Sequence, residues 1–418
     1  MFQLTEPQKM IQQMLRQYVT KEIKPQVEAM EDGEVSCFEV ARKFYKTMGG
    51  PSMIKPALEK VAKKREEGDQ ASSDLTSLMA GESEDEAGAM GGDPMMMFLI
   101  VKELSRVSPG LAMSFGVSAG LAGGAIISKG TARQVREYGI PLMTLEKIGS
   151  WCLTEPGAGS DAFGSMKTKA REDGKGGFVI NGTKTFITNA PVADLFITYA
   201  KVDSGEGSSS EMPVHTFILE RDMEGLTIGK PFHKMGMKDS LTAEVFMDDV
   251  KLDTIHVMGE SVQKGGRQAT KESLGNERSG VPAMCWGIIE RCYEESVAYA
   301  RERIQFGKSI AEFQATQLKI YRMYMHLMNI ENMVYRMAWM QKNGVRDVSY
   351  INGCKAYSSM AAVEVTNEAL QIFGGYGYMR EYPIEKLYRD AKLLELGAGT
   401  TDINMMTCAR NELGLIGS

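Results

Sequence analysis

The chain has 418 residues, enough for two or three domains of roughly 150 residues each and for sizeable hydrophobic cores. Its composition, 43% hydrophobic and 24% charged, is typical of globular proteins and excludes a disordered chain, a fibrous chain and a small disulfide-stapled module. The formal net charge of −6 argues against a nucleic-acid partner, because phosphate backbones favour basic surfaces.

The cysteine and histidine positions and the N-terminal sequence further restrict the class of protein. The six cysteines are scattered without a CxxC pair, and the four histidines lack metal-ligand spacing, so we expect reduced thiols and no metal site. The N-terminal sequence resembles neither an export signal nor a transit peptide, and the expected location is cytoplasmic. Residues 107–128 are uncharged and long enough to span a membrane. Their five glycines and four serines favour a closely packed buried helix instead, and we expect no membrane span.

Residues 1–149 are predicted to form an N-terminal α-helical domain. Apolar side chains recur at helical spacing from the start, for example at Met10, Met14 and Leu15, with polar residues on the other face. From about residue 60 to residue 92 the sequence is rich in charge, Ser and Gly, which indicates an exposed insertion.

Residues 150–258 change to a period of two and are predicted to form a middle β domain, an antiparallel barrel or sandwich. Residues 178–180 and 183–188 are predicted to be two strands joined by Asn181-Gly182, a pair well suited to a two-residue hairpin turn. Further strands are predicted in the segments LFITYAKV, VHTFILER, GLTIG and AEVFMDDVKL.

Residues 259–418 return to helical spacing and are predicted to form a C-terminal helix bundle. Residues 317–341 place Met, Leu, Ile and Tyr three and four residues apart, as the core face of a bundle requires. The 31 methionines concentrate partly there, and we interpret them as adaptable core residues rather than as a metal or cofactor site. The order helix, strand, helix indicates the α+β fold class.

The sequence WCLTEPGAGSD at residues 151–161 opens the β region with a tight glycine-rich turn. Such a turn brings backbone N–H groups close to an anion, as a pyrophosphate site requires. The turn alone is weak support, because Gly-Ala-Gly turns are common on surfaces. Neither a GxGxxG between a strand and a helix nor a GxxxxGK[ST] is present, so no Rossmann or P-loop site is expected.

Five segments together resemble the acyl-CoA dehydrogenase flavoprotein family across nearly the whole chain. They are WCLTEPGAGSD (151–161), INGTKTFITNA (180–190), HKMGMKDSLTAEVFMDDVKL (233–252), RIQFGKSIAEFQATQ (303–317) and QIFGGYGYMREYPIEKLYRDAK (371–392). The resemblance implies a helical N-terminal domain, a central β domain, a C-terminal four-helix bundle and bound FAD. It also implies an acyl-CoA substrate, an electron-transferring flavoprotein as electron acceptor, and a homo-oligomer, usually a tetramer.

The resemblance assigns roles to residues of the first two motifs. The residues that would line the flavin are Trp151, Leu153, Thr154, Phe186 and Thr188. Thr188 would hydrogen-bond flavin N5, the atom that receives hydride. Gly159 and Ser160 would meet the FAD pyrophosphate, and Ser160 would also lie at the acyl-CoA entrance.

The later motifs resemble residues that reach the FAD of a neighbouring subunit. These residues are Arg303, Phe306, Gln371, Gly374 and Gly375. Thr400 and Asp402 match positions that also contact FAD in relatives. The resemblance therefore implies that oligomerisation completes the cofactor site.

The chain departs from the family pattern at the catalytic base. Removal of an α-proton from an acyl thioester needs a positioned base, which most of the family supplies as a Glu in the sequence YEGT. Here residues 396–400 are LGAGT, so Ala398 stands in that place. Isovaleryl-CoA and long-chain dehydrogenases supply the base from another helix, in a segment like LDLER, and this chain has LGNER at residues 274–278. Glu277 is therefore the candidate base.

Other residues near the base keep alternatives open. Glu277 could instead be a solvated carboxylate at a helix N-terminus. Asp402 is a second acidic candidate, ranked below Glu277 because relatives use that position for FAD. The backbone N–H of Ala398 can still polarise the thioester carbonyl, because that donor does not depend on the side chain. By resemblance, Arg278 would contact CoA.

The leading hypothesis is FAD-dependent α,β-dehydrogenation of an acyl-CoA. One alternative is a non-oxidative family member, such as a desulfinase-like enzyme that lacks the usual base. Another is a non-enzymatic or nucleic-acid-associated flavoprotein on this fold, against which the net acidity weighs. A reduced-flavin monooxygenase is a further alternative, disfavoured by the pyrophosphate motif. The length and branching of the acyl group stay open.

Overall fold

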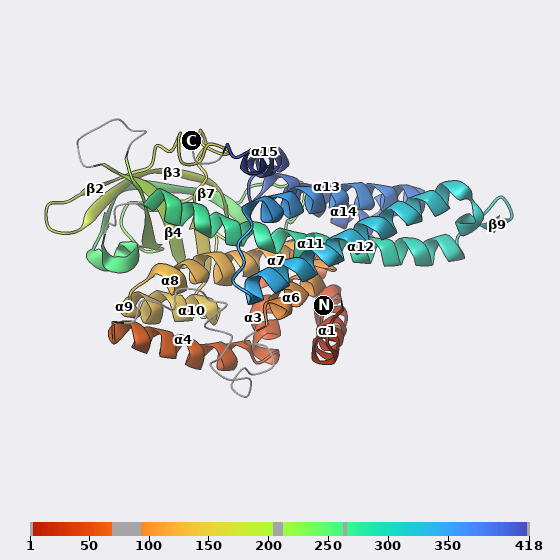
Figure 1. The fold of residues 1–418 in the computed structure, drawn as a ribbon, viewed down its shortest axis with the longest axis horizontal. Helices are drawn as coiled ribbons and strands as arrows, with labels where there is room; N and C mark the ends of the chain where they lie inside the picture. Colours follow the sequence, from red (N-terminus) through yellow and green to blue (C-terminus); the bar gives the residue numbers. More distant parts are fainter. Residues whose placement is uncertain (1–2, 69–92, 204–211, 262–265, 416–418) are drawn as a thin grey trace.

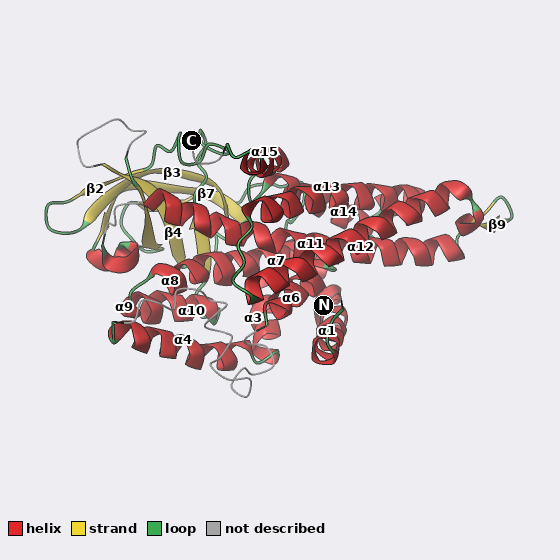
Figure 2. Ribbon diagram, viewed as in Figure 1, coloured by secondary structure: helices red, strands yellow, loops and turns green. Residues whose placement is uncertain are grey.

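The computed structural model describes residues 3–68, 93–203, 212–261 and 266–415, and the side chains of residues 266–277 are not described. Three regions follow one another along the chain. A group of helices forms the first, a β-sheet forms the second, and long helices that extend away from both form the third (Figure 1). Figure 2 shows that the strands are confined to the middle of the chain and to one small hairpin at the far end of the long helices.

The first region consists of short and medium helices. They are α1 (Glu6–Tyr18), α2 (Val27–Glu31), α3 (Cys37–Thr47), α4 (Gly50–Glu66), α6 (Pro94–Ser105), α7 (Pro109–Phe115), α8 (Gly124–Lys129), α9 (Ala132–Gln134) and α10 (Ile140–Met143). Thr5 precedes helix α1, and its hydroxyl caps the first turn together with Gln8. Of the predicted exposed insertion, residues 60–66 belong to helix α4 and bury Val61 and Ala62 in the core. Its remainder, residues 69–92, lies outside the described residues.

The uncharged stretch that raised the membrane question is a core element. Residues Pro109–Lys129 are long and apolar enough to cross a membrane, but 72% of the apolar window is buried inside the protein. A π-helical segment, η3 (Gly116–Gly123), joins α7 to α8 within it. Ala122, Ala125 and Ile126 of this stretch pack on strand residues Leu195 and Ile197, so the helix covers one face of the sheet.

A seven-stranded sheet follows in the described residues. Its strands are β1 (Gly149–Cys152), β2 (Lys169–Glu172), β3 (Phe178–Thr188), β4 (Leu195–Asp203), β5 (Val214–Glu220), β6 (Leu226–Ile228) and β7 (Thr242–Leu252). The sheet is mixed rather than purely antiparallel, which corrects the prediction in detail. Strands β1 and β2 both run parallel to β4 and occupy successive parts of one of its edges, whereas β5 pairs with the other edge.

The predicted hairpin at Asn181-Gly182 is wrong. Strand β3 runs through both residues without a turn, and its register with β7 shifts between Ile180 and Gly182, as at a β-bulge. Gly182 is required there for two reasons. Its φ is +150°, and a Cβ would lie 2.4 Å from the Thr168 Oγ1. Long-range pairing with β7 therefore overrides the local turn signal.

The last region is the predicted helix bundle. Its helices are α11 (Gly266–Glu302), α12 (Gln314–Lys342), α13 (Val348–Phe373), α14 (Ile384–Leu396) and α15 (Thr401–Glu412). Met323, Met337 and Met340 of α12 are buried, which agrees with the interpretation of the methionines as core residues. The short strands β8 (Ile304–Gln305) and β9 (Lys308–Ser309) form a hairpin at the far end of the bundle (Figure 1).

Buried and half-buried ion pairs join the helical regions. The Lys102 ammonium lies 2.8 Å from Glu290 Oε1, and Arg16 Nη2 lies 2.9 Å from Glu103 Oε1, which links α1 and α6 to α11. The amide of Asn189 donates to the carbonyls of Ser114 and Gly149, both at 3.0 Å, and so ties the sheet to the first region. These contacts fix the sheet and the bundle against a common set of helices.

Candidate active site

The glycine-rich loop that follows β1 lies at a break in the sheet. The chain leaves the edge of β4 after Cys152 and returns to the same edge at Lys169, so the intervening loop projects from the sheet. A backbone bridge between Glu155 and Ala158 closes its tight turn, with N···O distances of 3.1 and 3.0 Å. The predicted glycine turn is thus a defined structure at the carboxyl end of a strand.

A buried ion pair holds this loop from below. The Lys184 ammonium, which is fully buried, donates to Glu155 Oε1 at 2.9 Å and to the Leu153 carbonyl at 3.1 Å. The same carboxylate accepts the backbone N–H groups of Lys167 at 2.7 Å and Thr168 at 3.0 Å. Burial opposes ionisation, but the Lys184 charge and these donors outweigh it and hold the pKa of Glu155 below its ordinary value. Glu155 therefore stays ionised and holds the loop.

The outer side of the loop is open to an anion. Gly159 and Ser160 are exposed, and within the described part of the chain their backbone N–H groups have no acceptor. A Cβ at Gly159 would meet no atom within 4 Å. The Asp161 carboxylate is turned into its own loop, where it accepts Gly164 N–H at 3.1 Å and the Ser165 hydroxyl at 2.6 Å. Free N–H donors without an opposing carboxylate fit a pyrophosphate.

Strand β3 brings an exposed aromatic ring beside this loop. The Thr185 N–H donates to the Thr154 carbonyl at 2.9 Å, which joins the two predicted flavin motifs. The next residue, Phe186, lies at a second register shift, has a φ of +57°, and leaves 69% of its surface exposed. A bulky residue in the left-handed region with an exposed ring is unfavourable unless the site uses it.

The remaining predicted flavin residues lie around the same loop. Trp151 and Thr188 are half-buried, and Leu153 is buried. The indole Nε1 of Trp151 is buried and has no hydrogen-bond partner among the described residues, and its ring lies 4.9 Å from that of Tyr199. An orphaned donor and an exposed ring next to an anion loop fit a flat heteroaromatic cofactor with a phosphate tail. The structure therefore brings the two predicted flavin motifs together.

The segment that holds Ala398 forms a loop between α14 and α15. Ala398 and Gly399 have φ values of +55° and +80°, and the Thr400 hydroxyl caps α15. The N–H of Ala398 has no acceptor in the described ranges, so it is available to a substrate carbonyl. Asp402 is exposed in the first turn of α15.

Arg278 of α11 reaches this loop. Its Nε donates to the Ala398 carbonyl at 3.3 Å, and its Nη1 donates to Asn352 Oδ1 at 2.8 Å. The side chain of Glu277, the predicted base, lies outside the described residues. Arg278, the next residue on α11, nevertheless contacts the Ala398 loop. By resemblance, this loop is where most relatives have their catalytic base. The predicted contact of Arg278 with CoA stays a prediction.

The residues predicted to serve a neighbouring subunit gather at the other end of the bundle. Arg303, Gly374 and Gly375 line a cavity of about 490 Å³, and the Arg303 guanidinium lies 5.6 Å from the Tyr376 ring centre. Gln371 is exposed nearby at the end of α13. Phe306, at the tip of the β8–β9 hairpin, has a φ of +53° and is 93% exposed.

This group is separated from the Ala398 loop of the same chain. Lys355 of α13 bonds the Gly399 carbonyl, whereas Gln371 lies sixteen residues further along the same helix. At 1.5 Å per residue the separation is about 24 Å. One chain therefore does not bring the two groups into one pocket.

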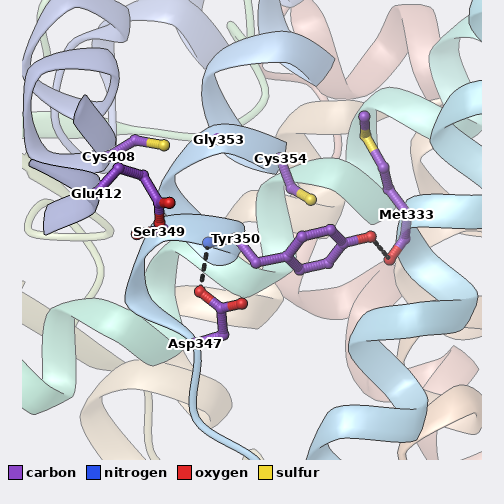
Figure 3. Close-up of a pocket in the computed structure, with 8 residues that line it drawn as sticks. All are labelled: Met333, Asp347, Ser349, Tyr350, Gly353, Cys354, Cys408 and Glu412. Carbon is purple, nitrogen blue, oxygen red and sulfur yellow. Dashed lines mark hydrogen bonds between the residues drawn. The ribbon is translucent and has the colours of Figure 1, made fainter.

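A second cavity, of about 320 Å³, lies between α12, α13 and α15 (Figure 3). Met333, Tyr350, Cys354 and Cys408 are among its lining residues. Burial raises the pKa of the Cys354 thiol to about 11, so the thiol is protonated and unreactive at neutral pH. No predicted site residue lines this cavity, and its described contacts, such as the Asp347 cap on the Tyr350 N–H at 2.8 Å, stabilise helix ends.

Sequence reasoning missed three residues that shape the two loops. Lys184 lies inside a predicted motif and in a predicted strand, and a lysine there was an available signal for an ion pair. Lys355 and Asn404 gave no comparable signal, because both lie in ordinary helical sequence.

The glycine-rich loop fits a flat, phosphate-bearing cofactor, and the Ala398 loop offers an N–H donor to a carbonyl group, two features that together indicate an enzyme. Family models agree with this class: the acyl-CoA dehydrogenase N-terminal domain matches residues 52–146, the middle domain residues 150–250, and the C-terminal domain residues 264–413. The chain belongs to the acyl-CoA dehydrogenase family, and the predicted family and fold class are confirmed. It is an oxidoreductase of the acyl-CoA dehydrogenase class.

Particular relatives cover almost the whole chain. A probable acyl-CoA dehydrogenase of Bacillus subtilis is 33% identical over 99% of this chain and 99% of its own length. The caffeyl-CoA reductase-Etf complex subunit CarC of Acetobacterium woodii is 37% identical over 76% of this chain and 82% of its own. The structure of butyryl-CoA dehydrogenase from Megasphaera elsdenii matches with a TM-score of 0.80 at 30% identity, covering 98% of this chain and 99% of that one.

Proposed function

We propose that this chain oxidises a saturated acyl-CoA thioester to the 2-enoyl-CoA with FAD as its cofactor and Glu277 as the base. One observation carries the proposal for the base. The free N–H of Ala398 and the helix that holds Glu277 meet at the same loop, because Arg278 binds the Ala398 carbonyl. A carbonyl-polarising donor and a carboxylate on facing elements are what α-proton removal needs.

The loop after β1 and strand β3 supply the cofactor residues. Gly159 and Ser160 would hold the pyrophosphate with backbone N–H groups, and Ser160 would also border the acyl-CoA entrance. Phe186 would cover the ring system, and Thr188 would orient it through N5, while Trp151, Leu153 and Thr154 would border it. When bound, FAD supplies the hydride acceptor for the β-hydrogen.

The chain's own residues perform the proton chemistry. The N–H of Ala398 donates to the thioester carbonyl and stabilises the negative charge that develops on its oxygen. This lowers the cost of breaking the α-C–H bond, and the Glu277 carboxylate takes the proton. The substrate thus loses one proton and one hydride, which balances its conversion into an enoyl thioester. Thr400 and Asp402 would border the cofactor at the start of α15.

The oligomer follows from the far end of the bundle. Arg303, Gln371, Gly374 and Gly375 would contact the FAD of a neighbouring subunit, since about 24 Å of helix separates them from the loop of their own chain. Phe306 and other apolar residues remain exposed there, including Ile304 and Tyr378. We infer a homo-oligomer, a tetramer by resemblance, that covers these residues.

Partners and location complete the proposal. An electron-transferring flavoprotein is the proposed electron acceptor, and the relative named as a subunit of a caffeyl-CoA reductase-Etf complex supports it. A cytoplasmic location stays a prediction. The non-oxidative alternative is not favoured, because the relatives are named dehydrogenases and reductases.

A substitution of the base tests the proposal. In Glu277→Gln, transfer of α-deuterium from a bound labelled acyl-CoA to solvent should fall by about 10²-fold or more, since a positioned base contributes on this scale. Glu302→Gln, at the exposed end of the same helix, is the matched control and should exchange like the wild type. Equal exchange in Glu277→Gln and wild type would exclude Glu277 as the base.

A further inference from the structure

We propose that Lys355 and Asn404 are positioning residues that clamp the Ala398 loop so that the Ala398 N–H faces the substrate carbonyl. The proposal rests on the proposed function and adds two residues to it. It begins with the backbone of the loop. Ala398 and Gly399 are consecutive left-handed residues, and this conformation is unfavourable for a residue with a Cβ such as Ala398. Contacts outside the loop must therefore hold it.

Asn404 provides the first of these contacts. Its side chain is fully buried in α15, and its Nδ2 donates to the carbonyls of Gly399 at 2.8 Å, Thr400 at 2.9 Å and Ala398 at 3.4 Å. One amide group thus gathers three successive carbonyl oxygens on the inner side of the loop. The Ala398 N–H belongs to the preceding peptide, so these bonds do not hold it directly. They fix the carbonyl side of Ala398 and the path of the loop after it, and thereby the backbone conformation on which the direction of the Ala398 N–H depends.

Lys355 provides the second contact, from a different helix. Its side chain is fully buried in α13, and the Nζ donates to the Gly399 carbonyl at 2.6 Å. Burial of an ammonium group is costly unless its hydrogen bonds are satisfied. The bond to the Gly399 carbonyl satisfies part of this requirement and ties α13 to the loop.

The contacts come from three separate helices. Arg278 of α11 binds the Ala398 carbonyl, Lys355 of α13 the Gly399 carbonyl, and Asn404 of α15 both. None of these side chains is on the loop itself. The geometry of the N–H donor is consequently set by the packing of the bundle, and this suits a catalytic group that must keep one orientation.

Two substitutions test the clamp on FAD-loaded enzyme. Lys355→Met and Asn404→Leu remove the donors and keep much of the side-chain volume. We expect kcat to fall by about 10-fold to 100-fold with little change in KM, since a small misplacement of a catalytic group costs rate on this scale. The second readout is the carbonyl stretch of a bound 1-¹³C-labelled 2-enoyl-CoA, chosen from a short, medium and long panel by binding to wild type. In the variants this band should move toward its frequency in free ligand.

A matched control separates positioning from general loss of stability. Lys102→Met removes another buried lysine, which bonds Glu290 at 2.8 Å, twelve residues beyond Arg278 on α11 and so about 18 Å along the helix. It should lower the unfolding temperature but leave kcat and the carbonyl band unchanged. Lys355→Arg retains charge and donors, so it should recover part of the band shift. It also keeps the test open if Lys355→Met does not fold.

The outcomes distinguish a failure of the proposed clamp from a failure of the proposed function. Variants with wild-type kcat and an unmoved carbonyl band would overturn the clamp, and so would a loss of kcat without any movement of the band. Failure of every thioester to reduce the wild-type flavin would instead overturn the proposed function.

Discussion

The buried ion pair beneath the glycine-rich loop leads to a prediction about Lys184→Met. The substitution leaves the side-chain volume nearly unchanged but removes the donor to Glu155 Oε1 and to the Leu153 carbonyl. Glu155 would then be a buried carboxylate that keeps only the N–H groups of Lys167 and Thr168. Because the two side chains are 0% and 4% exposed, solvent cannot replace the lost ammonium.

The expected cost follows from this burial. Removing one partner of a buried ion pair typically costs about 3–5 kcal/mol, and the free energy of unfolding should fall by that amount. The lost contacts stabilise the glycine-rich loop that would hold the FAD pyrophosphate. The variant should therefore also release FAD more readily. Both effects have one origin and should appear together.

Urea unfolding followed by tryptophan fluorescence measures the first effect, and retention of FAD during gel filtration measures the second. Lys175→Met, on an exposed turn, is the control and should change stability by less than about 0.5 kcal/mol. A loss below about 1 kcal/mol in Lys184→Met, with FAD retained as in wild type, would refute the role given to the ion pair.

Three further predictions concern pH, assembly and thiols. The native pKa values of Glu31, Glu155 and Glu290 lie below the ordinary 4.5, so the unfolded chain binds more protons in acid. The urea midpoint should hold above about pH 5 and fall as the pH drops through the lowered native values, whereas a midpoint that rises in acid would contradict this. Phe306→Ser should weaken self-association in sedimentation experiments, and an unchanged assembly would argue against an interface there. Cys354 should resist thiol reagents at pH 8 until the protein unfolds, and fast labelling of the folded protein would oppose the pKa of about 11.

Much of the architecture could be predicted from hydrophobic periodicity. The segments LFITYAKV, VHTFILER, GLTIG and AEVFMDDVKL are the strands β4 to β7, because each alternates or is continuously apolar between turn residues. The helical first and last regions follow in the same way from spacings of three and four. Local patterns of this kind are properties of the segment itself, and the sequence contains them.

Pairing between distant strands could not be predicted in this way. Asn181-Gly182 has the local signature of a hairpin, yet β3 continues through it because β7 pairs along both halves and Thr168 approaches Gly182. The parallel pairing of β1 and β2 with β4 likewise depends on where the chain returns after the glycine-rich loop. Neither outcome is encoded in a short window of residues.

The same distinction applies to the candidate site, where motif residues could be predicted and the residues that hold them could not. Motif residues such as Phe186 and Ala398 were found by resemblance, and the structure adds that both adopt left-handed backbone. The residues that hold them, Lys184, Lys355 and Asn404, are recognised only by their burial and by the carbonyls they meet. The role of such supporting residues depends on contacts between distant segments, which a single sequence does not reveal.

The central claim is that the chain removes hydrogen from an acyl-CoA thioester. Its most direct test is the anaerobic addition of short, long, branched and cyclic saturated acyl-CoA thioesters to the FAD-loaded protein, with the flavin absorbance followed in time. The proposed function predicts that at least one thioester bleaches the flavin and is recovered as its 2-enoyl-CoA. A flavin that stays oxidised with every thioester, although FAD is bound, would contradict the claim.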